Sequence, residues 1–310
     1  MTPTFRNFCR RSIASVLTAG SIALMALPAW AGDPFRGASS SHSIDAQTEA
    51  AFNKIFVEGN YPEAARLLQN ADPNEPLAYA MRASLAYLDG QVDALGENAR
   101  LTRESAERLV ATDPLRGHLY VAVGHFLEGA HLFLTESRIR ATPIVLGKLQ
   151  QVFDNLEEAE KIDANDPELN LLKGYMDLML AVNLPFSNPQ QAIDRLREHA
   201  NPDYLAERGI AIGYRDLDQQ DQALEAVNRA IALTPNNPDL LFLKAQILTR
   251  QGKLAESLPL YEQALALRAQ LPNSLAAQMT FEQCRVENRV NQNRRQRNCD
   301  AERDAVRDGQ

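Results

Sequence analysis

The feature that most constrains this chain is a self-similar pattern with a period of 34 residues within residues 204–267. Ala211 recurs as Ala245, and Ala230 recurs as Ala264, so each alanine returns 34 positions later. Apolar residues inside each half of a unit are spaced three and four apart, which is the spacing of one face of an α-helix. Such a period predicts stacked helical units, each of which buries its apolar face against its neighbours.

These two units resemble the tetratricopeptide repeat (TPR) family, whose unit of this length is a pair of antiparallel helices. Small residues stand where helices approach closely, tyrosines fill the remaining gaps, and a proline follows the second helix, where it no longer interrupts helical hydrogen bonds. The matching positions are Ala211, Tyr214, Ala223, Val227, Ala230 and Pro235 in the first unit and Leu241, Ala245, Leu248, Ser257, Tyr261 and Ala264 in the second. The resemblance implies an all-α fold, a TPR-like right-handed α-solenoid of about twelve helices plus a C-terminal capping helix.

Upstream of the clear units the repeat pattern is weaker, but turn signals still divide the chain into helical lengths. Three Asp-Pro steps, at residues 72–73, 113–114 and 166–167, each combine a helix stop with a helix start. Between the second and third steps we predict two long helices, over residues 115–137 and 143–162.

The N-terminus has the pattern of a secretory signal peptide. Positively charged residues precede an apolar stretch at 12–27, and Ala29 and Ala31 form a small-residue box before Gly32. We predict cleavage between Ala31 and Gly32, by either the general secretory or the twin-arginine route. The alternative, a transmembrane anchor, is disfavoured because the apolar stretch is shorter than the roughly 20 residues that span a bilayer.

The charge balance bears on the choice of partner. The formal net charge is −8, and loss of the three signal arginines makes it −11. Nucleic-acid binding needs a basic footprint, so we expect no nucleic-acid partner. Nor do we expect stable membrane insertion, and the sequence leaves the oligomeric state open.

Cysteine usage agrees with export. Cys9 would leave with the signal, and Cys284 and Cys299 remain. An even pair in an oxidising compartment predicts a disulfide, the alternative being two free thiols. On one unbroken helix the two would lie about 22 Å apart, whereas bridged Cα atoms lie within roughly 7 Å. The chain must therefore turn back between them, near residues 291–293.

These arguments together divide the chain into five segments. We predict a signal peptide in residues 1–31, a flexible Gly- and Ser-rich segment in 32–43, degenerate TPR-like helical repeats in 44–203, two clear TPR units in 204–271, and a capping helix with a disulfide-closed basic tail in 272–310.

Motifs for catalysis are absent from the sequence: there is no phosphate-binding loop of Walker type, nucleophile elbow, His-Glu-x-x-His site or Cys-x-x-Cys pair. We therefore expect no enzyme activity and no cofactor. His118, His125 and Glu128 are candidates for a metal site, on one expected helix that also carries His131 and Glu136. A solvent-facing polar stripe explains them more simply. A metal-binding protein or metalloenzyme that uses the His/Glu face of the helix over residues 115–137 is the alternative function.

The TPR resemblance also implies where a partner binds, because the first helix of each TPR unit lines a concave groove. The groove positions are Leu205, Arg208, Ile212 and Arg215 in the first unit and Asp239, Phe242, Gln246 and Thr249 in the second. Chaperone-binding members hold a carboxylate with a Lys/Asn clamp, and here Arg208 and Ile212 depart from it. Arg208 and Arg215 could pair with carboxylates, beside Phe242 as an apolar anchor.

The whole chain resembles an uncharacterised exported TPR family of cyanobacteria, through its export signal, irregular early helices, two good repeats and two-cysteine tail. That resemblance implies the periplasm or the thylakoid lumen. The function that we predict is an exported scaffold that binds a segment of a partner protein in the TPR groove, for example as an assembly factor.

Overall fold

The structure is a computed structural model of the 310-residue chain. It describes residues 32–37, 41–183, 188–291 and 296–309. Contacts divide the chain into residues 1–30 and 31–310, and the fold described below belongs to the second unit. The expected signal peptide, with Ala31, lies outside the described residues.

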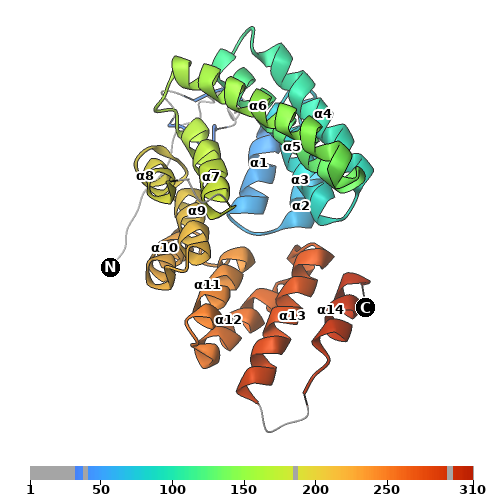
Figure 1. Cartoon of the computed structure of the whole chain (residues 1–310), viewed down its shortest axis with the longest axis vertical. Coiled ribbons are helices and arrows are strands. Elements are labelled where there is room, and N and C mark those ends of the chain that lie inside the picture. The colour runs from blue at the N-terminus through green and yellow to red at the C-terminus, as the bar shows by residue number, and fades with distance from the viewer. Residues whose placement is uncertain (1–31, 38–40, 184–187, 292–295, 310) are drawn as a thin grey trace, which may run out of the picture. The chain divides into compact units, whose positions relative to one another are not determined.

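Within the described ranges every regular element is helical, which confirms the all-α prediction. Figure 1 shows the helices in chain order. They are α1 (Ala46–Phe56), α2 (Tyr61–Leu68), α3 (Pro76–Leu88), α4 (Val92–Leu109), α5 (Pro114–Thr135), α6 (Arg138–Ile162), α7 (Pro167–Asn183), α8 (Pro189–His199), α9 (Asp203–Asp216), α10 (Gln220–Leu233), α11 (Pro238–Arg250), α12 (Leu254–Ala266), the 3₁₀ helix η1 (Arg268–Gln270), α13 (Asn273–Val290) and α14 (Cys299–Arg307).

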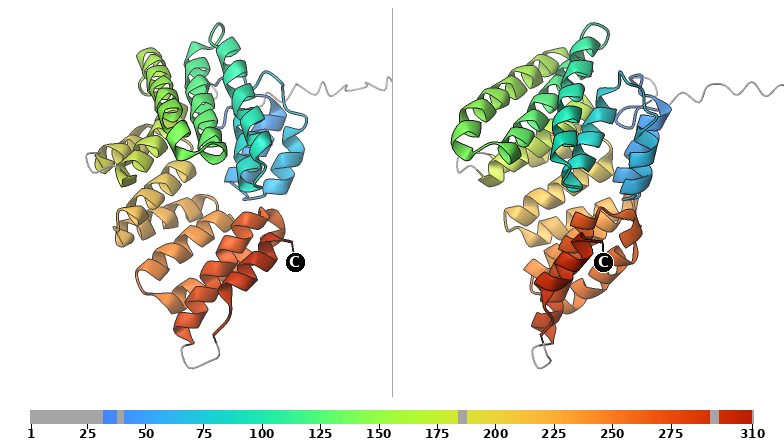
Figure 2. Two further views of the ribbon diagram at one scale, coloured as in Figure 1. Left: turned by 45° about the vertical axis from the view of Figure 1, so that its right-hand side comes forward. Right: turned by 90° about the vertical axis from the view of Figure 1, so that its right-hand side faces the viewer.

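Consecutive helices pack in pairs. α1 lies against α2, α3 against α4, and the same pairing continues to α13 and α14. Successive pairs also contact each other, as α4 does α5 and α12 does α13, and the two views of Figure 2 show the pairs side by side. This arrangement is a TPR-like α-solenoid.

Helix starts follow the polar residues that precede prolines. The side chains of Asp113, Asn188 and Asn237 each accept a hydrogen bond from a backbone N–H of the first helical turn, and proline occupies the first turn that follows. An N-cap of this kind satisfies a donor that the helix itself leaves unpaired.

One expected boundary is wrong. We expected a helix to begin at Pro143, but α6 begins at Arg138 and passes through Pro143. A proline inside a helix removes one backbone hydrogen bond. The helix nevertheless continues, because α6 packs along α5 over much of its length.

The two clear repeat units are built as the sequence predicts. Ala211 on α9 and Ala245 on α11 are both fully buried and occupy equivalent places in successive pairs, as Ala230 and Ala264 do on α10 and α12. Tyr261 on α12 is fully buried too, with its ring centroid 5.9 Å from that of Phe242 on α11. Close helix approach therefore depends on the absence of larger side chains at the alanine positions.

The expectation that residues 32–43 are flexible is wrong for residues 33–36. Phe35 is buried, and its ring centroid lies 5.0 Å from that of Phe52 on α1. Arg36 is buried too, and it pairs with Asp166 at 2.6 Å and Glu168 at 2.9 Å. The Gly and Ser content of the segment conceals these anchors, and residues 38–40 are not described.

The first helices lie directly against the last ones. Asn237, which caps α11, donates from Nδ2 to the Phe56 carbonyl at 3.0 Å. The Tyr61 hydroxyl at the start of α2 donates to Asp239 on α11 at 2.5 Å. At the start of α13, the Ser274 hydroxyl donates to a carbonyl of α3. Helices α1–α3 therefore cover part of the inner face that the TPR resemblance leaves open.

Candidate functional site

Six of the eight predicted groove residues line one hollow of about 370 Å³. They are Arg208, Ile212, Arg215, Asp239, Phe242 and Gln246. We call this space the groove hollow. Of the other two, Leu205 is buried in the core, and the Thr249 hydroxyl donates to the Ala245 carbonyl of its own helix.

The opposite wall of the groove hollow comes from the N-terminal helices, which the sequence analysis did not place there. It consists of Ile55, Phe56, Tyr61, Met81, Ser84, Leu85 and Leu88, and α13 adds Leu275 and Gln278. The residues of the N-terminal wall lie some 150 positions or more from α11 in the chain. No local pattern could reveal such a contact, because periodicity describes only neighbouring elements.

At one rim of the groove hollow the polar side chains are bonded to one another. The Arg215 guanidinium pairs with Asp216 at 2.8 Å and donates to Gln246 Oε1 at 2.7 Å. The Gln246 amide donates in turn to Glu282 on α13 at 3.0 Å. Arg215 thus has bonds of its own and is a weaker candidate for a partner carboxylate than the sequence suggested.

Arg208 is different. It is partly buried, and none of the described residues forms a hydrogen bond or an ion pair with its guanidinium. Asp239 acts on it only through space, and one oxygen of that carboxylate has no hydrogen-bond partner among the described residues. Burial raises the pKa of Asp239, opposed by Arg208 and by the hydrogen bond from Tyr61. The site therefore contains a cation and a carboxylate with unused bonding capacity.

A second, largely apolar space adjoins the first. An outer hollow of about 460 Å³ and an inner hollow of about 270 Å³ share the lining residues Ser84, Val123, Leu127, Leu172 and Tyr175. We call the two together the apolar chamber. Ser84 and Ile212 line both the groove hollow and the outer hollow. The groove hollow and the inner hollow share Phe56, Met81, Ser84 and Arg208.

A network of buried charges that the sequence did not reveal adjoins the inner hollow through Tyr120. Arg116 pairs with Glu75 at 2.8 Å and lies 3.4 Å from Glu168, which also accepts a hydrogen bond from the Tyr120 hydroxyl. Burial raises the pKa of Glu75, although Arg116 opposes the shift. The network joins α3, α5 and α7 to Arg36, in the buried residues 33–36 that precede α1. We assign the network to fold stability because its polar groups face one another.

The His and Glu candidates on α5 are each engaged by protein groups, and His125 Nδ1 also lies 3.5 Å from the Glu128 carboxylate. His118 Nδ1 lies 3.0 Å from the Asn155 side-chain oxygen, and His125 Nδ1 lies 3.3 Å from Lys148 Nζ. Although burial acts against it, hydrogen bonds from His125, Lys148 and Arg103 lower the pKa of Glu128 to about 2. No group of three or more potential metal ligands occurs among the residues that the structure describes.

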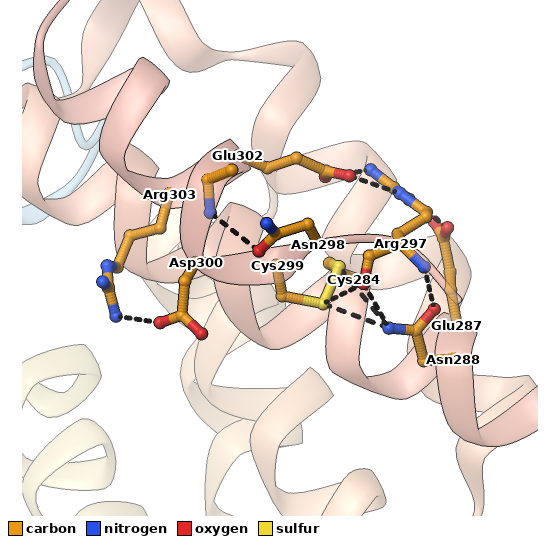
Figure 3. The surroundings of a disulfide bond; sticks show 10 residues. Cys284, Glu287, Asn288, Arg297, Asn298, Cys299, Asp300, Glu302 and Arg303 are labelled. Carbon is orange, nitrogen blue, oxygen red and sulfur yellow. Dashed lines mark hydrogen bonds and ion pairs between the residues drawn. A yellow bond between two sulfur atoms is a disulfide. The ribbon is translucent and has the colours of Figure 1, made fainter. Parts of the chain in front are cut away.

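The predicted disulfide is present. Cys284 on α13 and Cys299 on α14 are bridged with a Cα–Cα distance of 5.5 Å (Figure 3), and the chain turns back between the two helices. Asn288 and Arg297 exchange two hydrogen bonds beside the bridge, at 2.9 and 3.0 Å. Arg297 also pairs with Glu287 and Glu302, so this part of the basic tail is neutralised within the chain.

Comparison with known proteins agrees with the repeat assignment. The family model described as tetratricopeptide repeat matches residues 226–258, from within α10 to the start of α12. The chain thus carries a tetratricopeptide repeat within an all-helical TPR-like α-solenoid.

Among solved structures, the chain is similar to TTC0263, a thermophilic TPR protein of Thermus thermophilus, with 20% sequence identity and a TM-score of 0.29. The similarity covers 71% of this chain and 89% of that one. No curated protein matches the sequence. Among the described residues, no helix is both long and apolar enough to span a membrane.

Proposed function

We propose that this chain is a non-enzymatic scaffold that binds a segment of a partner protein in the groove hollow. The observation that carries the proposal is Arg208, a cation with no bonding partner among the described residues, in a hollow whose other walls include Phe242 and Leu275. A carboxylate of the partner would pair with the guanidinium in a bidentate manner. Asp239 in the same hollow would repel that carboxylate, and burial of an apolar side chain of the same segment beside Phe242 would offset the repulsion.

The volume of the hollow limits what enters. About 370 Å³ accommodates a few side chains, whereas a whole helix about 10 Å across needs a much wider groove. The partner segment is therefore a loop or a chain end that inserts an acidic and an apolar side chain. Such a role suits an assembly factor that holds one subunit while another joins it.

Site-specific photo-crosslinking tests this proposal. Gln278 is exposed at the rim of the groove hollow, and Gln190 is an exposed glutamine on α8, outside the hollow. A photoreactive amino acid at each position, in the cells that make the protein, compares one rim with one control surface. We expect a discrete protein adduct from position 278 that is missing from position 190.

Charge reversal supplies the second arm of the test. Arg208→Glu should abolish the adduct, whereas Arg229→Glu, at an exposed arginine of α10 outside the hollow, should leave it unchanged. Equal adducts at both glutamines, or an adduct that survives Arg208→Glu, would mean that the groove hollow is not the binding site.

We further propose that the protein is exported, to the periplasm or, in a cyanobacterial cell, to the thylakoid lumen, with cleavage after Ala31. Gly32 supports this: its backbone nitrogen lies 2.8 Å from a carboxylate oxygen of Glu49. Cleavage would convert that amide into an ammonium group, and a charge-assisted hydrogen bond to Glu49 would replace a neutral one. N-terminal sequencing of the purified protein should begin at Gly32, and an intact Met1 would exclude this cleavage.

The metal-binding alternative has no supporting observation in the part of the chain that the structure describes. Glu128 already holds Arg103 at 2.8 Å and Lys148 at 2.5 Å, so a metal ion would have to displace both cations. We therefore do not extend that proposal.

A further inference from the structure

The inner hollow of the apolar chamber has one charged lining residue among the residues that the structure describes, and that residue is Arg208. The remaining walls are aliphatic or aromatic, apart from Ser84. Arg208 is partly buried, and a guanidinium that loses part of its water without gaining a hydrogen-bond partner is held at a cost in free energy. An anion in the inner hollow would remove that cost.

The other side of Arg208 is less suited to a free anion. There the groove hollow contains Asp239, whose carboxylate would repel it. A small anion consequently finds its best position on the chamber side of the guanidinium. The two hollows can therefore take different ligands, although they meet at Arg208.

The chamber extends well beyond Arg208. It passes Val123, Leu127, Leu172 and Tyr175 into the outer hollow of about 460 Å³, which Phe126, Met176, Leu178 and Met179 also line. Asp216 is the one charged side chain described in the outer hollow, and it is paired with Arg215. The volume suits a single small-molecule ligand, with a cation at one end and an apolar wall along the rest.

The polar groups in the chamber wall are already used as donors. The Ser84 hydroxyl donates to the Ala80 carbonyl at 3.0 Å, and the Tyr175 hydroxyl donates to the Leu205 carbonyl at 2.7 Å. The Tyr120 hydroxyl donates to a buried glutamate. An extended peptide would bring unpaired N–H and C=O groups into this space, each at a cost. An alkyl chain brings none and gains from the removal of its surface from water.

We propose that the apolar chamber binds a long-chain carboxylic acid, with its carboxylate on Arg208 and its alkyl chain running past Leu172 and Tyr175 into the outer hollow. The bidentate geometry of guanidinium and carboxylate fixes the head group. The apolar lining selects the alkyl chain only by its length and its width. This inference goes beyond the partner-binding function and does not depend on it.

The test uses palmitate, with hexadecanol as the uncharged ligand of the same chain length, titrated into the purified and delipidated protein. We expect one palmitate to bind per chain, and Arg208→Gln to weaken palmitate about ten- to hundredfold while changing hexadecanol much less. Arg229→Gln, at an exposed arginine outside both hollows, is the matched control and should bind palmitate as the natural chain does.

A second variant tests the position of the alkyl chain. Val123 lines both hollows of the chamber but not the groove hollow. Val123→Phe should weaken both palmitate and hexadecanol, and Val290→Phe, at an exposed valine at the end of α13, should weaken neither. Thermal unfolding of each variant shows that it is folded.

The proposal is overturned if palmitate does not bind to the natural chain, if Arg208→Gln leaves palmitate binding intact or weakens both ligands equally, or if folded Val123→Phe binds as before. Failure here leaves the partner-binding proposal standing, because Gln278 lines the groove hollow but neither hollow of the apolar chamber. Loss of that crosslink, conversely, says nothing about palmitate.

Discussion

Replacement of Arg36 by alanine should destabilise the protein by about 3–5 kcal/mol, which is the usual cost of removing one member of a buried ion pair. The Arg36 side chain is only 2% exposed and contacts three carboxylates, of Asp33, Asp166 and Glu168, at 2.6–2.9 Å. Glu168 keeps Arg116 at 3.4 Å after the change. Asp166 loses both of its bonds to the guanidinium and remains buried.

Urea unfolding followed by far-UV circular dichroism measures the effect. The control is Arg66→Ala, since the pair of Arg66 with Glu63 at 2.6 Å is exposed and should contribute little to the free energy of unfolding. Arg36→Lys should fall between the two, because lysine keeps the charge but loses the planar fork. If Arg36→Ala lowers the free energy of unfolding by less than about 1 kcal/mol, or by no more than the control does, then residues 33–36 are not part of the folded core.

Three further changes test separate parts of the structure. Cys284→Ser combined with Cys299→Ser should lower stability by about 2–4 kcal/mol in denaturant unfolding, and a reducing agent should then have no further effect. Because Glu128 has its pKa lowered from 4.5 to about 2, its contribution is complete above pH 4.5 and is lost as pH falls towards 2. Glu128→Gln should flatten that decline, of up to about 3 kcal/mol, in unfolding series across this range. Ala245→Leu should lower the free energy of unfolding by about 1–3 kcal/mol because leucine overpacks the helix contact, whereas the same change at an exposed alanine should not. Thermal unfolding measures both variants.

The repeat period predicted the parts of the fold that depend on neighbours in the chain. Ala211 and Ala245 identified the stacked pairs, and the Asp-Pro steps located the starts of α5 and α7 within a residue or so. The disulfide followed from compartment and geometry together. In each case the physical cause is local, because helix periodicity, capping and chain reversal depend on residues that are close together in the sequence.

The remainder depends on contacts between distant segments, and the sequence carries no local sign of them. From the sequence, Arg36 belongs to a Gly- and Ser-rich segment that we predicted to be flexible. In the structure it pairs with Asp166 and Glu168 at the start of α7. The sequence gives Arg215 as a residue able to bind a partner carboxylate, whereas in the structure it is bonded to Asp216 and Gln246. Arg208 was identified as a groove residue from the family pattern, but its lack of a bonding partner among the described residues is a property of the whole packing.

The contact between the N-terminal helices and α11 decides how a partner can enter. An inner face left open along several repeats could receive a long segment of a partner, with one contact for every unit. Here the capping residue Asn237 bonds to α1, and Tyr61 bonds to Asp239, so the space beside Phe242 is a hollow with walls on opposite sides. Side chains therefore enter it from a rim near Gln278, and affinity depends on a few of them. A substitution that separates α2 from α11, such as Tyr61→Ala, should consequently alter partner binding as strongly as a change in the groove itself.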